Sequence, residues 1–148
     1  MKQLIDLMEN RALIACVISW AAAQGAKVLL CHLIEKKWDW KRFFGLGGMP
    51  SSHSSVVCTL AVSAGIMRGF GSLEFVIALV LAMIVMTDAS GVRREAGQHA
   101  RVLNHILQDM MNEDKGITFD TLKELLGHSP FEVSVGALLG VLVAFIVM

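Results

Sequence analysis

Residues 47–55, which read Gly-Gly-Met-Pro-Ser-Ser-His-Ser-Ser, join a loop to the polar start of a helix that continues into the apolar run 56–67. Serine at a helix start caps backbone N–H groups, and the helix dipole adds partial positive charge there. Such a helix start can bind an anion, and His53 in its first turn can reach that anion. A serine-capped loop with one surface histidine explains this segment equally well.

A second segment, residues 127–132, reads Gly-His-Ser-Pro-Phe-Glu and precedes the apolar run 133–148. Ser129 as N-cap, Pro130 at the first helical position and Glu132 at the third predict a capping box. His128 would then lie just outside the helix, beside its positive end. A carboxylate four residues after a histidine can hold one ring nitrogen, which leaves the other nitrogen unprotonated and nucleophilic.

The composition indicates a membrane protein with one domain over residues 1–148. The chain is 55% hydrophobic and has 18% charged residues, below the roughly 25% of a typical soluble domain. Lys plus Arg and Asp plus Glu are 13 each, so the charge gives no sign of a nucleic-acid partner, and none is expected. The three cysteines lie within apolar stretches without a C-x-x-C motif, which favours core residues over a disulfide or metal site.

Four apolar segments, residues 12–34, 54–67, 73–86 and 133–148, are rich in Ala, Gly, Ser and aliphatic residues, as packed membrane helices are. The last three are shorter than the ~20 residues of a typical span, so a soluble helical core is the alternative. The chain has too little polar sequence to cover three or four such helices. We therefore predict an all-α integral membrane helical bundle of about four transmembrane helices.

Two polar stretches separate these segments. Residues 35–55 carry Trp38 and Trp40 among lysines and arginines, which is typical of a membrane interface. Residues 88–129 contain a helical apolar spacing over 92–111, which predicts an interfacial amphipathic helix, and a short helix over 119–126. Asp6 and Glu9 lie where a signal peptide needs basic residues, so we expect residues 1–30 to remain in the mature protein.

Four crossings bring both polar stretches to the same face of the membrane. Ten of the 13 Lys and Arg residues then lie on that face, and the positive-inside rule predicts that it is cytoplasmic. We expect a location in a bacterial inner membrane. The residues that can meet at this face are Lys27, Arg42, His53, Asp88, Arg93 and His128.

Together these motifs resemble the type 2 phosphatidic acid phosphatase and vanadium-dependent haloperoxidase superfamily, and they are most similar to its divergent branch of small membrane proteins. The resemblance extends from about residue 24 to the C-terminus. The residues that carry it are Pro50-Ser51-Ser52-His53, Asp88-Ala89-Ser90-Gly91-Val92-Arg93-Arg94-Glu95-Ala96-Gly97, and Gly127 to Val133 followed by Gly136 and Gly140.

The resemblance implies metal-free phosphoryl transfer without a cofactor, in which positioning and charge neutralisation do most of the catalysis. It assigns His128 as the nucleophile, Glu132 as the residue that orients it, and His53 as the general acid. The implied substrate is a phosphate monoester or diphosphate, such as a membrane lipid or prenyl phosphate. The substrate-binding candidates are Lys27, Arg42, Ser51, Ser52, Arg93, Arg94 and Asp88.

The chain departs from the superfamily pattern at the phosphate-binding positions. Phe43 replaces the proline that usually follows the first-motif arginine, and Leu122 stands where the third motif has an arginine. Arg93 or Arg94 is the candidate replacement for that charge. The sequence therefore also allows a non-catalytic membrane protein that retains an anion-binding scaffold.

The sequence does not decide the role of Asp88. This residue closes the third apolar segment, where an ionisable side chain suggests function, although a salt bridge to a nearby arginine is equally favoured. Leu103, rather than an acid, lies four residues after His99. Both His99 and His105 fit surface or packing roles, and no ligand spacing supports a metal site. A short bundle leaves apolar surface exposed, which makes a homodimer plausible under either functional hypothesis.

Overall fold

The computed structural model describes residues 2–36, 38, 40–43, 48–113 and 127–148, and the ordered elements in these ranges are helices. The elements are α1 (Lys2–Met8), α2 (Arg11–Glu35), the 3-10 turn η1 (Trp40–Phe43), α3 (Ser52–Arg68), α4 (Leu73–Ser90), α5 (Val92–Glu113) and α6 (Pro130–Val147). The all-α prediction is confirmed. The short helix expected over 119–126 lies outside the described residues.

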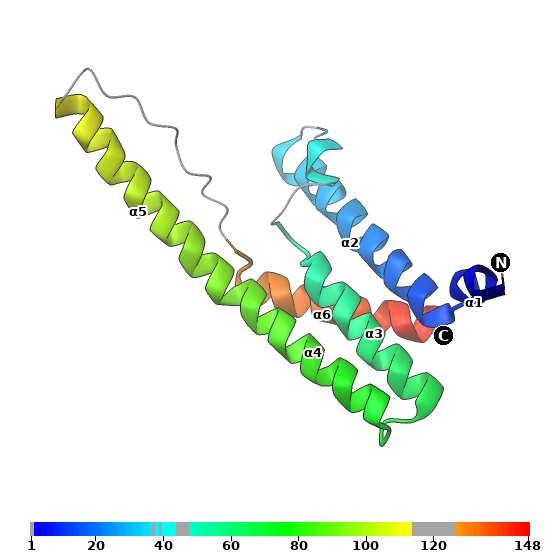
Figure 1. Ribbon diagram of the computed structural model, residues 1–148. Helices are drawn as coiled ribbons and strands as arrows, with labels where there is room; N and C mark the ends of the chain where they lie inside the picture. The colour runs from blue at the N-terminus through cyan, green and yellow to red at the C-terminus, as the bar shows by residue number, and fades with distance from the viewer. Residues whose placement is uncertain (1, 37, 39, 44–47, 114–126) are drawn as a thin grey trace.

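Helix α3 forms the centre of the bundle. It packs against α2, α4 and α6, whereas α2 and α4 do not contact each other within the described ranges. Figure 1 shows α3 between α2 and α4, with α6 crossing obliquely behind it. All three neighbours therefore shield a helix that carries more hydroxyl groups than they do.

Three helices are long and apolar enough to cross a membrane: α2, a segment from Leu73 to Gln108 that joins α4 to most of α5, and α6. The four-helix prediction counted α3 as well. Helix α3 has 17 residues, including Ser54, Ser55, Thr59 and Ser63, which lower its hydropathy. Its partners cover these hydroxyls, so the polar face of α3 lies inside the bundle.

Residue types are distributed in the opposite way to those of a water-soluble protein. The bulkiest fully buried side chains are hydroxyl-bearing, and they are Thr59, Ser19, Ser51, Ser54, Ser55 and Ser63. Large apolar side chains point outward, as Ile77 and Ile146 do with 60% and 81% exposure. Lipid can solvate such an outer surface, while small polar residues pack and hydrogen-bond inside. This distribution supports the membrane assignment independently of helix length.

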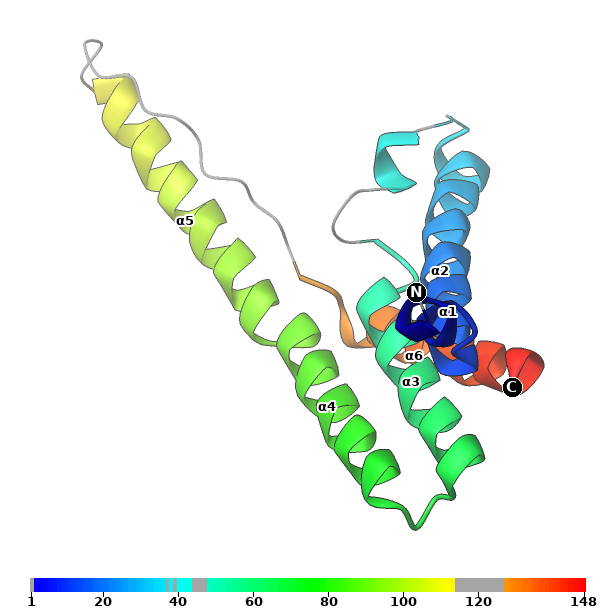
Figure 2. The same ribbon diagram turned by 45° about the vertical axis from the view of Figure 1, so that its right-hand side comes forward.

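Helix α5 continues the direction of α4 and extends beyond the bundle (Figures 1 and 2). Among the described helices it contacts only α4, and its apolar residues Val102, Leu103 and Ile106 are exposed. The predicted amphipathic helix over 92–111 is thus present, and its location at the membrane interface stays a prediction.

Candidate functional site

The starts of α3 and α6 and the end of α4 meet at one end of the bundle. The backbone N–H of His128 donates to the carbonyl oxygen of Ala89 in α4, 3.0 Å away, and the N–H of Ser51 donates to the carbonyl oxygen of Glu132, 3.1 Å away. These two bonds hold three segments that are distant in the sequence, around Ser51, Ala89 and His128, at the same end of the bundle. The shared face expected from the topology therefore exists for these segments.

The start of α6 has the local structure that its sequence predicts. Ser129 is the N-cap, and both halves of a capping box with Glu132 are present. The Glu132 Oε2 atom accepts from the Ser129 N–H at 2.9 Å and lies 3.3 Å from His128 Nδ1. Because the carboxylate oxygen accepts, this geometry favours a proton on Nδ1 of His128, which puts the lone pair of the neutral ring on Nε2.

His53 and His128 lie beside each other at this end of the bundle. Their ring centroids are 6.1 Å apart, and their ring planes are inclined by 61°. His128 is only 4% exposed, and His53 is half-buried in the first turn of α3. Rings at this separation and inclination are in edge-to-face contact, so the two imidazoles share one local environment.

Lys27 brings a positive charge to the same region from α2. Its side chain is 5% exposed, its Nζ donates to Ser52 Oγ at 3.4 Å, and it attracts the Glu132 carboxylate electrostatically. A buried lysine inside an apolar helix is costly unless charge or hydrogen bonds compensate it. Lys27 is therefore a strong candidate for binding a further anion.

Ser51 and Ser52 shape the anion-binding helix start. Ser51 is the N-cap of α3, with its Oγ 3.4 Å from the Ser54 N–H, and both serines are buried. The two glycines of α6, Gly136 and Gly140, make this packing possible, because a methyl group at Gly136 would overlap the carbonyl oxygen of Ser51. The loop is thus held directly against α6, near His128.

The structure leaves the other predicted cations unplaced. Arg42 belongs to η1, and Arg93 and Arg94 belong to the first turn of α5, but their side chains lie outside the described residues. Asp88 is half-buried near the end of α4, next to the Ala89 carbonyl that binds His128. Among the side chains that are described, no group of three His, Cys, Asp or Glu residues is arranged to hold a metal ion.

Sequence reasoning did not identify the hydroxyl cluster that lies deeper in the bundle. Thr59 Oγ1 lies 2.8 Å from Ser19 Oγ, 2.8 Å from the Ser55 carbonyl oxygen and 2.9 Å from the Gly140 carbonyl oxygen. Ser19 Oγ is also 2.6 Å from Ser55 Oγ. The recurring small polar residues of α3 were a signal for it, but their partners on α2 and α6 were not readable from spacing alone.

Comparison with known proteins identifies the family. A family described as "Divergent PAP2 family" matches residues 8–143. The chain belongs to the divergent PAP2 family. It is also 36% identical to the uncharacterized membrane protein YuiD of Bacillus subtilis (strain 168), over 96% of each chain. No solved structure matches the chain.

Membership in the divergent PAP2 family confirms the resemblance found in the sequence. Together with the three apolar helices and the membrane-protein relative, it identifies an integral membrane protein with a phosphatase-like family background. The relative's name specifies neither an activity nor a substrate.

Proposed function

We propose that this protein is a membrane phosphohydrolase or phosphotransferase that acts on a phosphate monoester or diphosphate of a lipid or prenyl alcohol. The observation that supports this function best is the pairing of His128 with Glu132, 3.3 Å apart, beside the His53 ring and the buried Lys27. These groups supply a nucleophile, its orienting carboxylate, an acid and a phosphate-binding cation.

In the first step, the lone pair of His128 Nε2 attacks phosphorus and forms a P–N bond. The bond between phosphorus and the leaving oxygen breaks, its electron pair stays on that oxygen, and protonated His53 gives the oxygen a proton. The Glu132 carboxylate stabilises the positive charge that develops on the His128 ring. Lys27 and the N–H groups at the start of α3 neutralise the phosphate oxygens.

In the second step, water attacks the phosphohistidine. Neutral His53 takes a proton from the water, the new P–O bond forms, and the P–N bond breaks with its electron pair returning to Nε2. Inorganic phosphate leaves, and both histidines regain their starting protonation states. An acceptor alcohol in place of water gives phosphotransfer by the same route.

The test is trapping of the intermediate with a radiolabelled phosphatidic acid and purified protein in detergent. We expect an acid-labile, base-stable phosphoryl group on His128 and phosphate release that vanadate inhibits. His128→Gln should abolish both, and Glu132→Gln, which keeps a capping residue at the third helical position, should lower phosphate release about 10²–10⁴-fold. His105→Ala, on the exposed part of α5, is the matched control and should release phosphate at the normal rate.

The same experiment distinguishes the second functional hypothesis, a non-catalytic anion-binding membrane protein. That protein would retain the phosphate lipid without releasing phosphate or becoming labelled. Phosphate release that persists at the normal rate in His128→Gln would instead remove His128 as the nucleophile.

We also propose that the site faces the cytoplasm of a bacterial inner membrane, because ten of 13 basic residues lie at this end of the bundle under the predicted topology. This orientation is tested with single cysteines at exposed positions of α5, treated in intact cells with a thiol reagent that does not cross the membrane. Labelling of these cysteines from outside would contradict the cytoplasmic orientation. A homodimer that covers part of the apolar surface is the proposed assembly, and cross-linking in the membrane tests it.

A further inference from the structure

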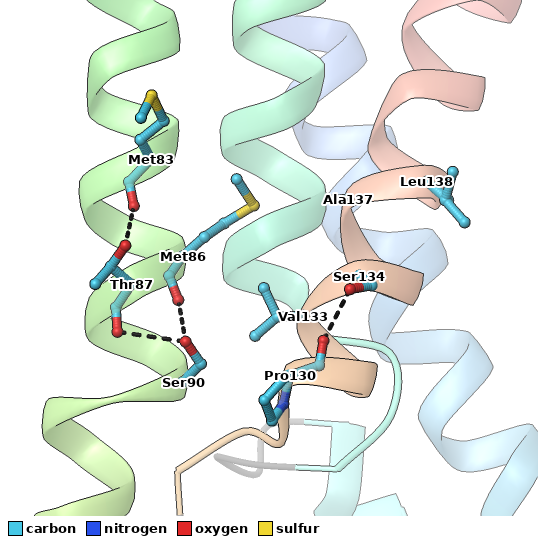
Figure 3. Close-up of a pocket in the computed structure, with 9 residues that line it drawn as sticks. All are labelled: Met83, Met86, Thr87, Ser90, Pro130, Val133, Ser134, Ala137 and Leu138. Atoms are coloured by element: carbon cyan, nitrogen blue, oxygen red, sulfur yellow. Dashed lines mark hydrogen bonds between the residues drawn. The ribbon is translucent and has the colours of Figure 1, made fainter.

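A groove opens beside the histidine site, between α4 and α6. It has a volume of about 680 Å³, and Met83, Met86, Pro130, Val133, Ala137 and Leu138 contribute its apolar walls. Figure 3 shows the Met86 and Val133 side chains between the two helices. Met86 Sδ lies 3.8 Å from Cys58 Sγ of α3, so α3 closes the inner side of the groove.

The polar groups that line the groove are bound to their own helices. Thr87 Oγ1 donates to the Met83 carbonyl oxygen at 2.8 Å, Ser90 Oγ to the Met86 carbonyl oxygen at 2.9 Å, and Ser134 Oγ to the Pro130 carbonyl oxygen at 2.9 Å (Figure 3). Their hydroxyl protons are therefore turned toward backbone rather than toward the groove. The surface that remains suits hydrocarbon better than a polar ligand.

One end of the groove adjoins the histidine site. Ser90 follows Ala89, whose carbonyl oxygen accepts from the His128 N–H at 3.0 Å. Pro130 is two residues after His128, and Val133 follows Glu132. A molecule in the groove therefore has its end close to the proposed nucleophile.

The length of the groove fits one leaflet of a bilayer. The residues that line it run from Met83 to Ser90 in α4 and from Pro130 to Leu138 in α6. These ranges are seven and eight residue steps long, which corresponds to about 10–12 Å. A leaflet contributes about half of the ~30 Å hydrocarbon core. Most side chains along the groove, including Met83 and Leu138, are also exposed on the outer surface, so the groove opens sideways.

The histidine site is buried, so a sideways opening toward lipid offers a route to it that does not pass through water. His128 is 4% exposed and Lys27 is 5% exposed, so little of either side chain is accessible from water. We propose that the groove between α4 and α6 holds one hydrocarbon chain of a phosphate-bearing lipid, whose phosphate then lies among Lys27, His53 and His128. This inference rests on the proposed function and specifies its substrate as a membrane lipid with a long chain.

Photo-crosslinking tests where the chain lies without relying on turnover. The His128→Gln variant is placed in phosphatidylcholine vesicles with a phosphatidic acid probe that carries a diazirine in one acyl chain. We expect crosslinks at Met83, Met86 and Leu138, and at least fivefold weaker labelling there with a diacylglycerol probe that carries the same diazirine. Equal labelling by both probes, or labelling spread evenly over α2, would overturn the proposal.

Activity measurements give a second readout. Ala137→Trp, which fills the groove, should raise the KM for a long-chain lipid phosphate at least tenfold and leave hydrolysis of phenyl phosphate within twofold of normal. Leu142→Trp, on the exposed surface of α6 outside the groove, is the matched control. Ser134→Leu narrows the groove from an exposed position and replaces Ala137→Trp if that variant does not fold.

Unchanged KM values in both groove variants would contradict the proposal. Absence of phosphate release from every substrate in the wild-type protein would contradict the proposed function, and the crosslinking pattern would still decide whether the groove binds a phosphate lipid.

Discussion

Helix α6 meets its two neighbours in different ways. Against α3, the backbones approach so closely that a methyl group at Gly136 or Gly140 would overlap a carbonyl oxygen of α3. Against α4, α6 makes far fewer contacts and leaves a groove of about 680 Å³. One interface fixes the positions of His53 and His128 relative to each other, and the other leaves space for a molecule beside them.

The difference follows from residue size and hydrogen bonding. Gly136 and Gly140 are four residues apart, so they lie on one face of α6 and allow the close approach that is common between membrane helices. Thr59 then joins α3 to the backbone of α6 at Gly140. On the groove side, the Thr87 and Ser134 hydroxyls bond within their own helices, so neither hydroxyl joins α4 to α6.

The largest expected effect comes from widening the tight interface. Gly140→Val introduces side-chain atoms where the Ser55 carbonyl oxygen lies, and backbone cannot move aside easily. We expect the free energy of unfolding to fall by about 3 kcal/mol or more, measured by denaturant unfolding in detergent with tryptophan fluorescence. Gly25→Val is the control, because a Cβ there has no atom within 4 Å, and an equal loss in both variants would contradict the close approach.

A smaller effect is expected from removing the hydroxyl that joins three helices. Thr59→Val keeps the side-chain shape but removes the bonds to Ser19 and to the carbonyl oxygens of Ser55 and Gly140. The free energy of unfolding should fall by about 1 kcal/mol. Thr87→Val removes a hydroxyl that bonds only within α4 and should have a much smaller effect. Similar losses in both variants would show that the bonds between helices at Thr59 add no stability beyond that of a bond within one helix.

The smallest effect is expected on the groove side. Ser134→Ala removes a hydroxyl that donates to the Pro130 carbonyl oxygen within α6 and is exposed. The free energy of unfolding should change by less than about 0.5 kcal/mol. A loss of unfolding free energy as large as that of Thr59→Val would contradict the difference between the two faces of α6, because the hydroxyl on the groove side would then stabilise the protein as much as the one on the α3 side.

Much of this architecture was predictable from sequence. The four apolar segments correspond to α2, α3, α4 and α6, and the serine and capping-box signals mark the starts of α3 and α6. Counting crossings then brought His53 and His128 to one end. These predictions succeed because hydropathy and capping are local properties of the chain.

The remaining features depend on pairs of distant segments. Helix α1 has seven residues and no capping signal that distinguishes it from a loop. The bond from the His128 N–H to Ala89 is between backbone groups, which carry no sequence signature. Likewise, the spacing of Gly136 and Gly140 indicates a packing face, but it does not say that Ser51 and Ser55 lie opposite.

The depth of Lys27 has one more consequence. Lys27 is eight residues before the end of α2 at Glu35, which places it about 12 Å along the helix from that end. Under the proposed function, a lipid that brings its phosphate to this ammonium group would place that phosphate about 12 Å deeper than the Glu35 end of α2. A large headgroup would have to follow the phosphate inward and lose its water, so the proposed function predicts a preference for lipids whose phosphate ends the molecule.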